Sequence, residues 1–276
     1  MKFGVFQVSR KGGREKNEDR MGYCYTRDAV MFALADGMGG HRAGEVASSR
    51  TIALIPQHIA AATADPTLPL VGRARHDCSV ATNRLASAVR VANHQVYQEA
   101  THDQAYAGMG TTVVAAWLVG SILSIAHVGD SRLYLIRNKT IQLLTRDHSL
   151  VQEQVRSGLL TDAEALRAAH KHVLTRAVGV QALVDVELRE WPVLNEDLLL
   201  LCSDGLTTGV SDDTILRVVL ESSDLQTVSH QLIAVANDAG GSDNTTVVVV
   251  KVTQRASGLW GRLYGRLFSS SAMDPQ

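Results

Sequence analysis

Short apolar runs with turn residues between them dominate the chain. Runs of this kind are typical of strands, and we expect strands at 2–9, 21–25, 30–35, 111–118, 121–127, 133–137, 183–189, 198–202 and 245–252. Two of the runs, LLLLC and TTVVVV, have no polar alternation. Strands of that composition are usually buried on both faces.

Helical periodicity occurs in separate stretches. Its clearest example is an apolar stripe at spacings of three and four residues, formed by Cys78, Ala81, Leu85, Ala88, Ala92 and Val96. This stripe predicts one long helix. A second helix should begin near Gly44 and end or kink at Pro56, because proline removes a backbone donor. Two more are expected at 212–221 and 225–238.

The segment 145–178 differs from its surroundings because it is polar and helical. Thr161 and Glu164 have the spacing of a capping box. We interpret the segment as a flap inserted between strands, which would tune substrate choice and gating. The economical architecture is two packed sheets with helices on their outer faces.

Composition narrows the function. The chain has 276 residues, a formal net charge of -1 and 45% hydrophobic residues. It is therefore neither disordered nor a general nucleic-acid binder, which would normally be basic. Three cysteines without a CxxC pair predict neither a disulfide framework nor a zinc site. No signal-peptide core or membrane-spanning run is evident, so we expect a cytoplasmic protein.

Acidic residues stand where the expected strands begin or end. They are Glu18, Asp19, Asp36, Asp130, Asp204 and Asp243. Taken alone, each acid could be a turn residue, since Asp-Gly and Asp-Asn are common turn pairs. Several carboxylates converging at the mouth of an apolar sheet would repel one another unless cations offset their charge. Oxygen ligands suit Mg²⁺ or Mn²⁺.

These acids belong to an ordered series of motifs: GGREKNEDR, ADGMGGHRAGE, GMGTT, HVGDSRLYLIR, LTRDHSLVQE, VLTRAVG, LLLCSDGL and GGSDNTTVVVV. The series resembles that of the metal-dependent protein phosphatases of the phosphatase 2C type, in their compact bacterial form. The resemblance implies an α+β fold, a four-layer α-β-β-α sandwich of two antiparallel sheets flanked by helix pairs. The catalytic domain would span 1–252, with the flap at about 145–178, and 253–276 would be a short basic tail.

The resemblance also implies roles for single residues. Asp36 would bridge two metal ions, Mn²⁺ or Mg²⁺, and Asp204 and Asp243 would complete the ligands of the first. Glu18 and the carbonyl of Gly37 would bind the second.

Four further residues receive roles from the resemblance. Asp130, with Asp204, would hold a third, weaker ion. Asp19 would stand behind the ligands, Asn244 would orient Asp243, and Arg14 would bind the phosphate group with its guanidinium fork.

The implied activity is hydrolysis of phosphoserine and phosphothreonine in proteins by a metal-activated water, without a phospho-enzyme intermediate. Its partners would be a bacterial Ser/Thr kinase and the substrates of that kinase. Animal members carry a histidine after the Asp-Gly pair, where this chain has Met38. The general acid would then be a metal-bound water or His41, and the alternative for His41 is an exposed loop residue.

Other histidines are less promising. His127 lies inside a strand pattern, and we expect a core residue with its hydrogen bonds satisfied. His148, His170 and His172 belong to the flap, where they would cap helices or face solvent, and contact with substrate is the other reading.

Three competing functions are weaker. Cys78 and Arg84 have the C-x5-R spacing of cysteine-dependent phosphatases, but their segment lacks glycine and lies on a helical stripe. A degenerate binding module should have lost ligand carboxylates, and this chain keeps them. A two-metal nuclease should have a basic groove, which the balanced charge disfavours.

The C-terminal tail carries apolar residues at helical spacing together with arginines. The apolar residues are Trp260, Leu263, Tyr264, Leu267 and Phe268. This pattern suggests a peripheral membrane or partner contact through 255–268. The alternative is a tail that packs on its own domain or is loose. We expect a monomer.

Overall fold

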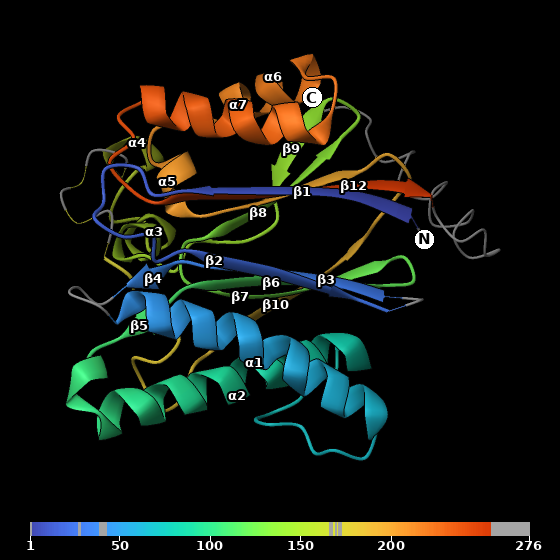
Figure 1. Cartoon of the computed structure of the whole chain (residues 1–276), viewed down its shortest axis with the longest axis vertical. Helices are drawn as coiled ribbons and strands as arrows, with labels where there is room; N and C mark the ends of the chain where they lie inside the picture. Colours follow the sequence, from blue (N-terminus) through green and yellow to red (C-terminus); the bar gives the residue numbers. More distant parts are fainter. Residues whose placement is uncertain are drawn as a thin grey trace.

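Four layers stack in the order helices, sheet, sheet, helices (Figure 1). The computed structural model describes residues 2–26, 29–38, 43–165, 168, 170 and 173–254. His41, His172 and the segment 255–276, which carries most of the predicted tail, lie outside the described residues. Among the helices described, none is both long enough and apolar enough to cross a bilayer.

Both large sheets are antiparallel, as expected. The first has the strand order β1 (Lys2–Arg10), β12 (Thr245–Gln254), β11 (Leu198–Cys202), β8 (Arg132–Arg137) and β9 (Thr140–Leu143). The second has the order β10 (Glu187–Pro192), β7 (Ile122–Val128), β6 (Val113–Val119), β3 (Ala29–Ala35) and β2 (Arg20–Tyr25). A small sheet pairs β4 (Gly37–Met38) with β5 (Gly110–Thr111).

Three apolar layers hold the sandwich together. Side chains of both sheets, among them Phe32, Leu133 and Leu201, meet between the sheets. Helices α6 (Asp212–Glu221) and α7 (Leu225–Asp238) cover the first sheet. Helices α1 (Gly44–Ala64) and α2 (Val80–His102) cover the second. Strands β11 and β12 are buried on both faces, which confirms the interpretation of LLLLC and TTVVVV.

Helix α1 does not end at Pro56, which was one of the two expected effects of the proline, because it continues to Ala64. Ile55 and Ile59 on either side of the proline are buried in the layer shared with α2. This packing stabilises the helix by more than the proline costs, roughly 3 kcal/mol in a helix interior. Helix α2 begins after its N-cap Ser79, so Cys78 lies outside it.

Strand β10 corrects another expectation, since it begins at Glu187 and not at 183. Glu187 is paired with His127 near the end of β7, and Leu183 is exposed. The partner strand β7 ends at Val128, one residue beyond this pair, so it does not reach the positions opposite 183–185. Five short elements were not predicted: β4, β5, β9, the 3₁₀ turn η1 (Gln104–Tyr106) and the turn of helix α5 (Asp204–Thr207).

The flap segment contains two short helices, α3 (Leu150–Arg156) and α4 (Asp162–Ala165). The predicted capping box is confirmed, because the backbone N–H of Thr161 donates to Glu164 Oε2 at 2.8 Å and the N–H of Glu164 donates to Thr161 Oγ1 at 3.3 Å. A 3₁₀ turn, η1 (Gln104–Tyr106), follows α2.

Candidate metal centre

The predicted acidic residues gather at one end of the sandwich, where α5 and β4 lie in Figure 1. Strand pairing explains this, since the end of β3 pairs with the start of β2 and the end of β11 pairs with the start of β12. Asp36 directly follows β3 and Asp204 opens α5 after β11. Asp243 lies just before β12, and Asp130 lies just after β7.

Electrostatics show that these carboxyl groups are close. The pKa of Asp36 is raised well above its ordinary value by burial and then by the charges of Asp19, Asp204, Asp130 and Asp243. Five predicted site residues therefore act on one another, as expected from their places at strand ends.

Neighbouring carboxyl groups respond in the same direction. Burial and the charge of Asp204 raise the pKa of Asp130 to about 8. Burial raises the pKa of Asp19 to about 6, and burial and Glu45 raise the pKa of Glu18. Ionised forms are thus disfavoured without a counter-charge. The donors are carboxylate and carbonyl oxygens, which fit hard divalent cations.

The backbone at Asp36 is held tightly. Its N–H donates to Thr112 Oγ1 at 2.9 Å, and its carbonyl accepts from Thr111 Oγ1 and from the N–H of Thr112, both at 2.8 Å. Gly37 packs so closely that a Cβ there would lie 2.2 Å from the carbonyl oxygen of Gly44. Glycine is required at this contact.

Asn244 joins the two loops that carry Glu18 and Asp243. Its Oδ1 accepts from the N–H of Glu18 at 2.8 Å, and its Nδ2 donates to the carbonyls of Lys11 and Lys16, both at 2.8 Å. Its own N–H donates to Asp243 Oδ1 at 2.8 Å. Asn244 therefore binds Asp243 through its backbone and the Glu18 loop through its side chain.

Asp19 lies deeper than the other acids and is 3% exposed. Its Oδ2 accepts from Ser203 Oγ at 2.8 Å, and its buried Oδ1 has no hydrogen-bond partner among the described residues. An orphaned carboxylate oxygen behind a ring of acids fits a position beside bound cations.

Arg14 stands at the rim, with its side chain 61% exposed. Its Nε donates to Asp243 Oδ1 at 2.8 Å and its Nη2 donates to Oδ2 at 2.7 Å. The bond to Asp243 raises the pKa of Arg14. The guanidinium fork is thus placed beside the acids.

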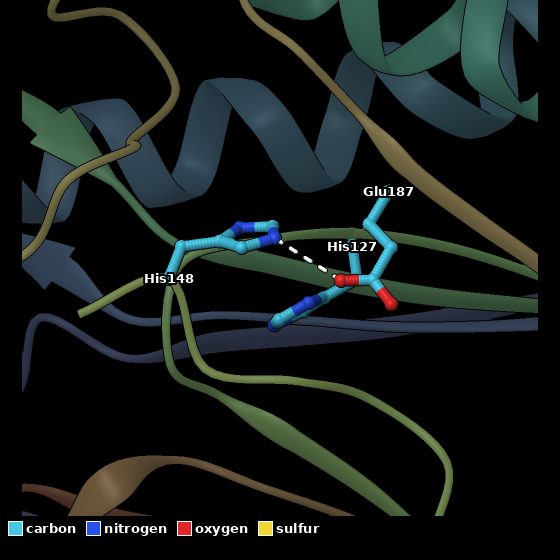
Figure 2. A group of neighbouring side chains, drawn as sticks. All are labelled: His127, His148 and Glu187. Carbon is cyan, nitrogen blue, oxygen red and sulfur yellow. Dashed lines mark hydrogen bonds and ion pairs between the residues drawn. The ribbon is translucent and has the colours of Figure 1, made fainter. Parts of the chain in front are cut away.

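Two histidines depart from the predictions. His127 is buried in the core, but neither ring nitrogen has a hydrogen-bond partner among the described residues, so the expectation of a satisfied histidine is wrong. His148 neither caps a helix nor faces solvent, because it is 7% exposed and binds Gly129 and Glu187. Figure 2 shows its contact with Glu187. His170 Nε2 lies 2.9 Å from Gln154 Oε1 within the flap.

The C-x5-R spacing is confirmed as a coincidence. The guanidinium of Arg84 is occupied by the carbonyls of Leu68 and Pro66. Burial raises the pKa of the Cys78 thiol, which disfavours the reactive thiolate.

Comparison with known proteins decides the family. The family model described as protein phosphatase 2C matches residues 8–237. The chain belongs to the protein phosphatase 2C family. It is 37% identical over 247 residues to the serine/threonine phosphatase stp of Listeria welshimeri, covering 89% of this chain and 94% of the relative. It is 34% identical to the protein phosphatase PhpP of Streptococcus pneumoniae, covering 87% of this chain and 94% of the relative.

Solved structures of phosphatases have the same fold. The serine/threonine phosphatase PstP/Ppp of Mycobacterium tuberculosis matches with a TM-score of 0.78 and 33% identity, over 91% of this chain and 99% of that structure. A PstP catalytic domain in complex with 2 manganese ions matches with a TM-score of 0.74 and 35% identity, over 91% of this chain and 99% of that structure. The chain is therefore a protein-serine/threonine phosphatase with the predicted four-layer fold.

Several supporting residues of this phosphatase 2C site were not predicted. Thr111, Thr112 and Ser203 hold Asp36 and Asp19 by hydrogen bonds, and all three are buried. Ser203 is next to Asp204 in the sequence, whereas Thr111 and Thr112 lie in the GMGTT motif and are next to no predicted acid. Small hydroxyl residues are too common in turns for such positions to single them out.

Proposed function

We propose that this phosphatase hydrolyses phosphoserine and phosphothreonine in proteins with a water activated by divalent ions, and without a phospho-enzyme intermediate. The observation that carries the proposal is that the charges of Asp204, Asp130 and Asp243 all raise the pKa of the buried Asp36. So many carboxylates beside one another favour bound cations.

The proposed ligands divide as follows. Asp36 is shared by two ions, Asp204 and Asp243 complete one of them, and Glu18 with the carbonyl of Gly37 serves the other. Mn²⁺ or Mg²⁺ fits these oxygen donors. When bound, the ions lower the pKa of a water so that hydroxide is available near neutral pH. The relative in complex with 2 manganese ions supports this assignment.

Asp130 and Asp204 would hold a third, weaker ion. The charge of Asp204 is the second cause, after burial, of the raised pKa of Asp130. A cation between the two carboxylates would remove that repulsion.

Arg14 would bind two oxygens of the substrate phosphate. A guanidinium fork matches that geometry and favours the charge that develops in the transition state. Met38 has no proton to give to the leaving oxygen. The proton would then come from water or from His41.

The physiological substrates we propose are proteins phosphorylated by a bacterial Ser/Thr kinase. The relatives from Listeria and Streptococcus support a bacterial setting, and their names give serine/threonine or protein phosphatase activity.

Phosphate release from phosphoserine and phosphothreonine peptides tests the proposal. Activity should require Mn²⁺ or Mg²⁺, stop with EDTA, and fall in Asp36→Asn to the level of the metal-free enzyme. Asp213→Asn, at an exposed position of α6, is the matched control and should keep full activity. Undiminished turnover in metal-free buffer would refute the mechanism.

A further inference from the structure

Three polar side chains meet beside the end of β7, outside the acidic site (Figure 2). His127 comes from β7, Glu187 from β10, and His148 from the segment before α3. His148 Nε2 lies 3.2 Å from Glu187 Oε2, and the two imidazole rings are 4.8 Å apart. His127 and His148 are 1% and 7% exposed, so both imidazole rings are shielded from water, while Glu187 is partly buried.

Two histidines and a carboxylate could in principle ligate a metal ion, since their ligand atoms lie within 4.8 Å of one another. The hydrogen bonds of His148 argue against this. The backbone N–H of Gly129 donates to His148 Nδ1 at 3.1 Å, so Nδ1 must carry a lone pair. The ring proton is then on Nε2 and is donated to Glu187. A metal on Nε2 would force the proton to Nδ1, against the Gly129 donor.

The same reasoning excludes a charged His148, because an imidazolium carries protons on both nitrogens. Glu187 completes the arrangement as an acceptor. Burial alone would raise its pKa, but the hydrogen bond from His148 and the nearby Arg189 lower it to about 2. Glu187 is thus a fixed negative charge that keeps the His148 proton on Nε2.

His148 also holds backbone on both sides. Its backbone N–H donates to the carbonyl of Gly129 at 2.8 Å, so His148 and Gly129 are joined by two hydrogen bonds. Its carbonyl accepts from the N–H of Thr175 at 2.8 Å, where the flap segment returns to the sandwich. The N–H of Leu150 donates to the carbonyl of Val173 at 2.8 Å in the same place.

Gly129 is the residue before Asp130, and its backbone cannot easily adopt another conformation. Its φ is +106°, and a Cβ there would lie 2.7 Å from the side chain of Thr112. Ser131 on the other side of Asp130 is bound through its Oγ to Thr112 Oγ1 at 2.7 Å. The two His148 bonds therefore fix one of the two backbone positions that direct the Asp130 carboxylate.

We propose that Glu187, His148 and Gly129 form a positioning relay that sets the place of Asp130 and joins it to the flap. Through this relay, His148 and Glu187 determine the affinity for the third divalent ion. This inference rests on the proposed function, in which Asp130 and Asp204 hold that ion. His148 and Glu187 are positioning residues, since neither touches the ion or the substrate.

Calorimetric titration of the metal-free full chain with Mn²⁺ tests the relay. Loss of a group behind a metal ligand typically weakens the ion about 10- to 100-fold. His148→Ala should weaken the third ion to this degree and leave the other ions unchanged. His148→Asn should restore much of the affinity, because its Oδ1 can accept from Gly129 as Nδ1 does. Glu187→Gln should lie between the wild type and His148→Ala.

Glu190→Gln is the matched control. It makes the same change on the same strand, β10. Glu190 binds Ser79 and Thr82 at the start of α2, so this variant should bind all ions with wild-type affinity. The relay would be overturned if His148→Ala bound the third ion as tightly as the wild type does. It would also be overturned if the wild type bound two ions and no third. A wild-type chain that binds no ion would contradict the proposed function itself.

A second readout needs no bound ion. Long-range ¹H–¹⁵N spectra of the metal-free protein should show His148 neutral with its proton on Nε2. A proton on Nδ1, or a charged ring, would overturn the relay. Zn²⁺ added to this sample should not shift the ring nitrogens of His127 and His148, and a shift of both rings would identify a metal site instead.

Discussion

Arg14 and Asp243 form a bidentate ion pair, in which Arg14 Nε donates to Asp243 Oδ1 at 2.8 Å and Nη2 donates to Oδ2 at 2.7 Å. The proposed function gives each of them another partner, a phosphate for Arg14 and a metal ion for Asp243. On the proposed function, binding of metal to Asp243 and of phosphate to Arg14 would compete with this ion pair.

Arg14→Ala should separate metal binding from catalysis. The pair is 61% and 34% exposed, and exposed ion pairs contribute less than about 1 kcal/mol. Losing it should leave Mn²⁺ affinity unchanged or raise it less than about fivefold. The value of kcat/KM for a phosphopeptide should fall about 100- to 1,000-fold, as for other lost transition-state donors. Arg14→Lys keeps the charge but not the guanidinium fork, so its kcat/KM should lie between those of the wild type and Arg14→Ala. A variant that loses metal affinity would contradict these roles.

Gly37→Ala should damage the site through packing alone. The new Cβ would lie 2.2 Å from the carbonyl oxygen of Gly44 and 2.8 Å from that of Glu18, and backbone cannot move aside as a flexible side chain does. The free energy of unfolding should fall by at least about 2 kcal/mol, measured by denaturant titration, and Mn²⁺ affinity should fall with it.

Gly13→Ala is the control for this change. Its nearest neighbour would be 3.4 Å away, an ordinary contact, so stability should change by less than about 0.5 kcal/mol. Equal stability of the two alanine variants would show that the contact at Gly37 is not close-packed.

The sequence predicted that Asp36, Asp130, Asp204 and Asp243 would lie together, because each acid borders a strongly apolar run. An apolar run predicts a strand, a strand ends at a sheet edge, and antiparallel pairing brings alternate ends together. That local signal was also sufficient for α6 and α7, whose observed bounds are the predicted ones.

Features that depend on a distant partner could not be predicted. Pro56 was expected to end or kink its helix, because the local sequence does not show that Ile55 and Ile59 pack in the layer shared with α2. The start of β10 is set by the end of β7, some 60 residues earlier in the chain. His148 resembled a surface residue, since Gly129 and Glu187 approach it only in the folded chain.

The acid sensitivity of folding should include one proton from His127. Burial lowers its pKa to about 3 in the folded chain, whereas the unfolded value is near 6.5. Between these values the unfolded chain binds the proton and the folded chain does not, so stability falls as the pH falls. The slope is about 1.4 kcal/mol per pH unit once the pH is well below 6.5.

Unfolding of the metal-free protein by urea measures this effect. Relative to His127→Gln, the wild type should lose about 2 kcal/mol between pH 7.5 and pH 5. Glu187 has a lowered pKa as well, but it changes charge only below this range and is common to both proteins. Parallel pH profiles of the wild type and His127→Gln would show that His127 accepts a proton in the folded chain.

The central claim is that the acids at the strand ends hold divalent cations beside Arg14. Anomalous diffraction from crystals soaked in Mn²⁺ and recorded at the manganese edge measures this most directly. We predict two strong peaks that share Asp36, with Asp204 and Asp243 at one and Glu18 at the other, and a weaker third peak at Asp130. No peak near Asp36, or manganese bound only at His127, His148 and Glu187, would contradict the account.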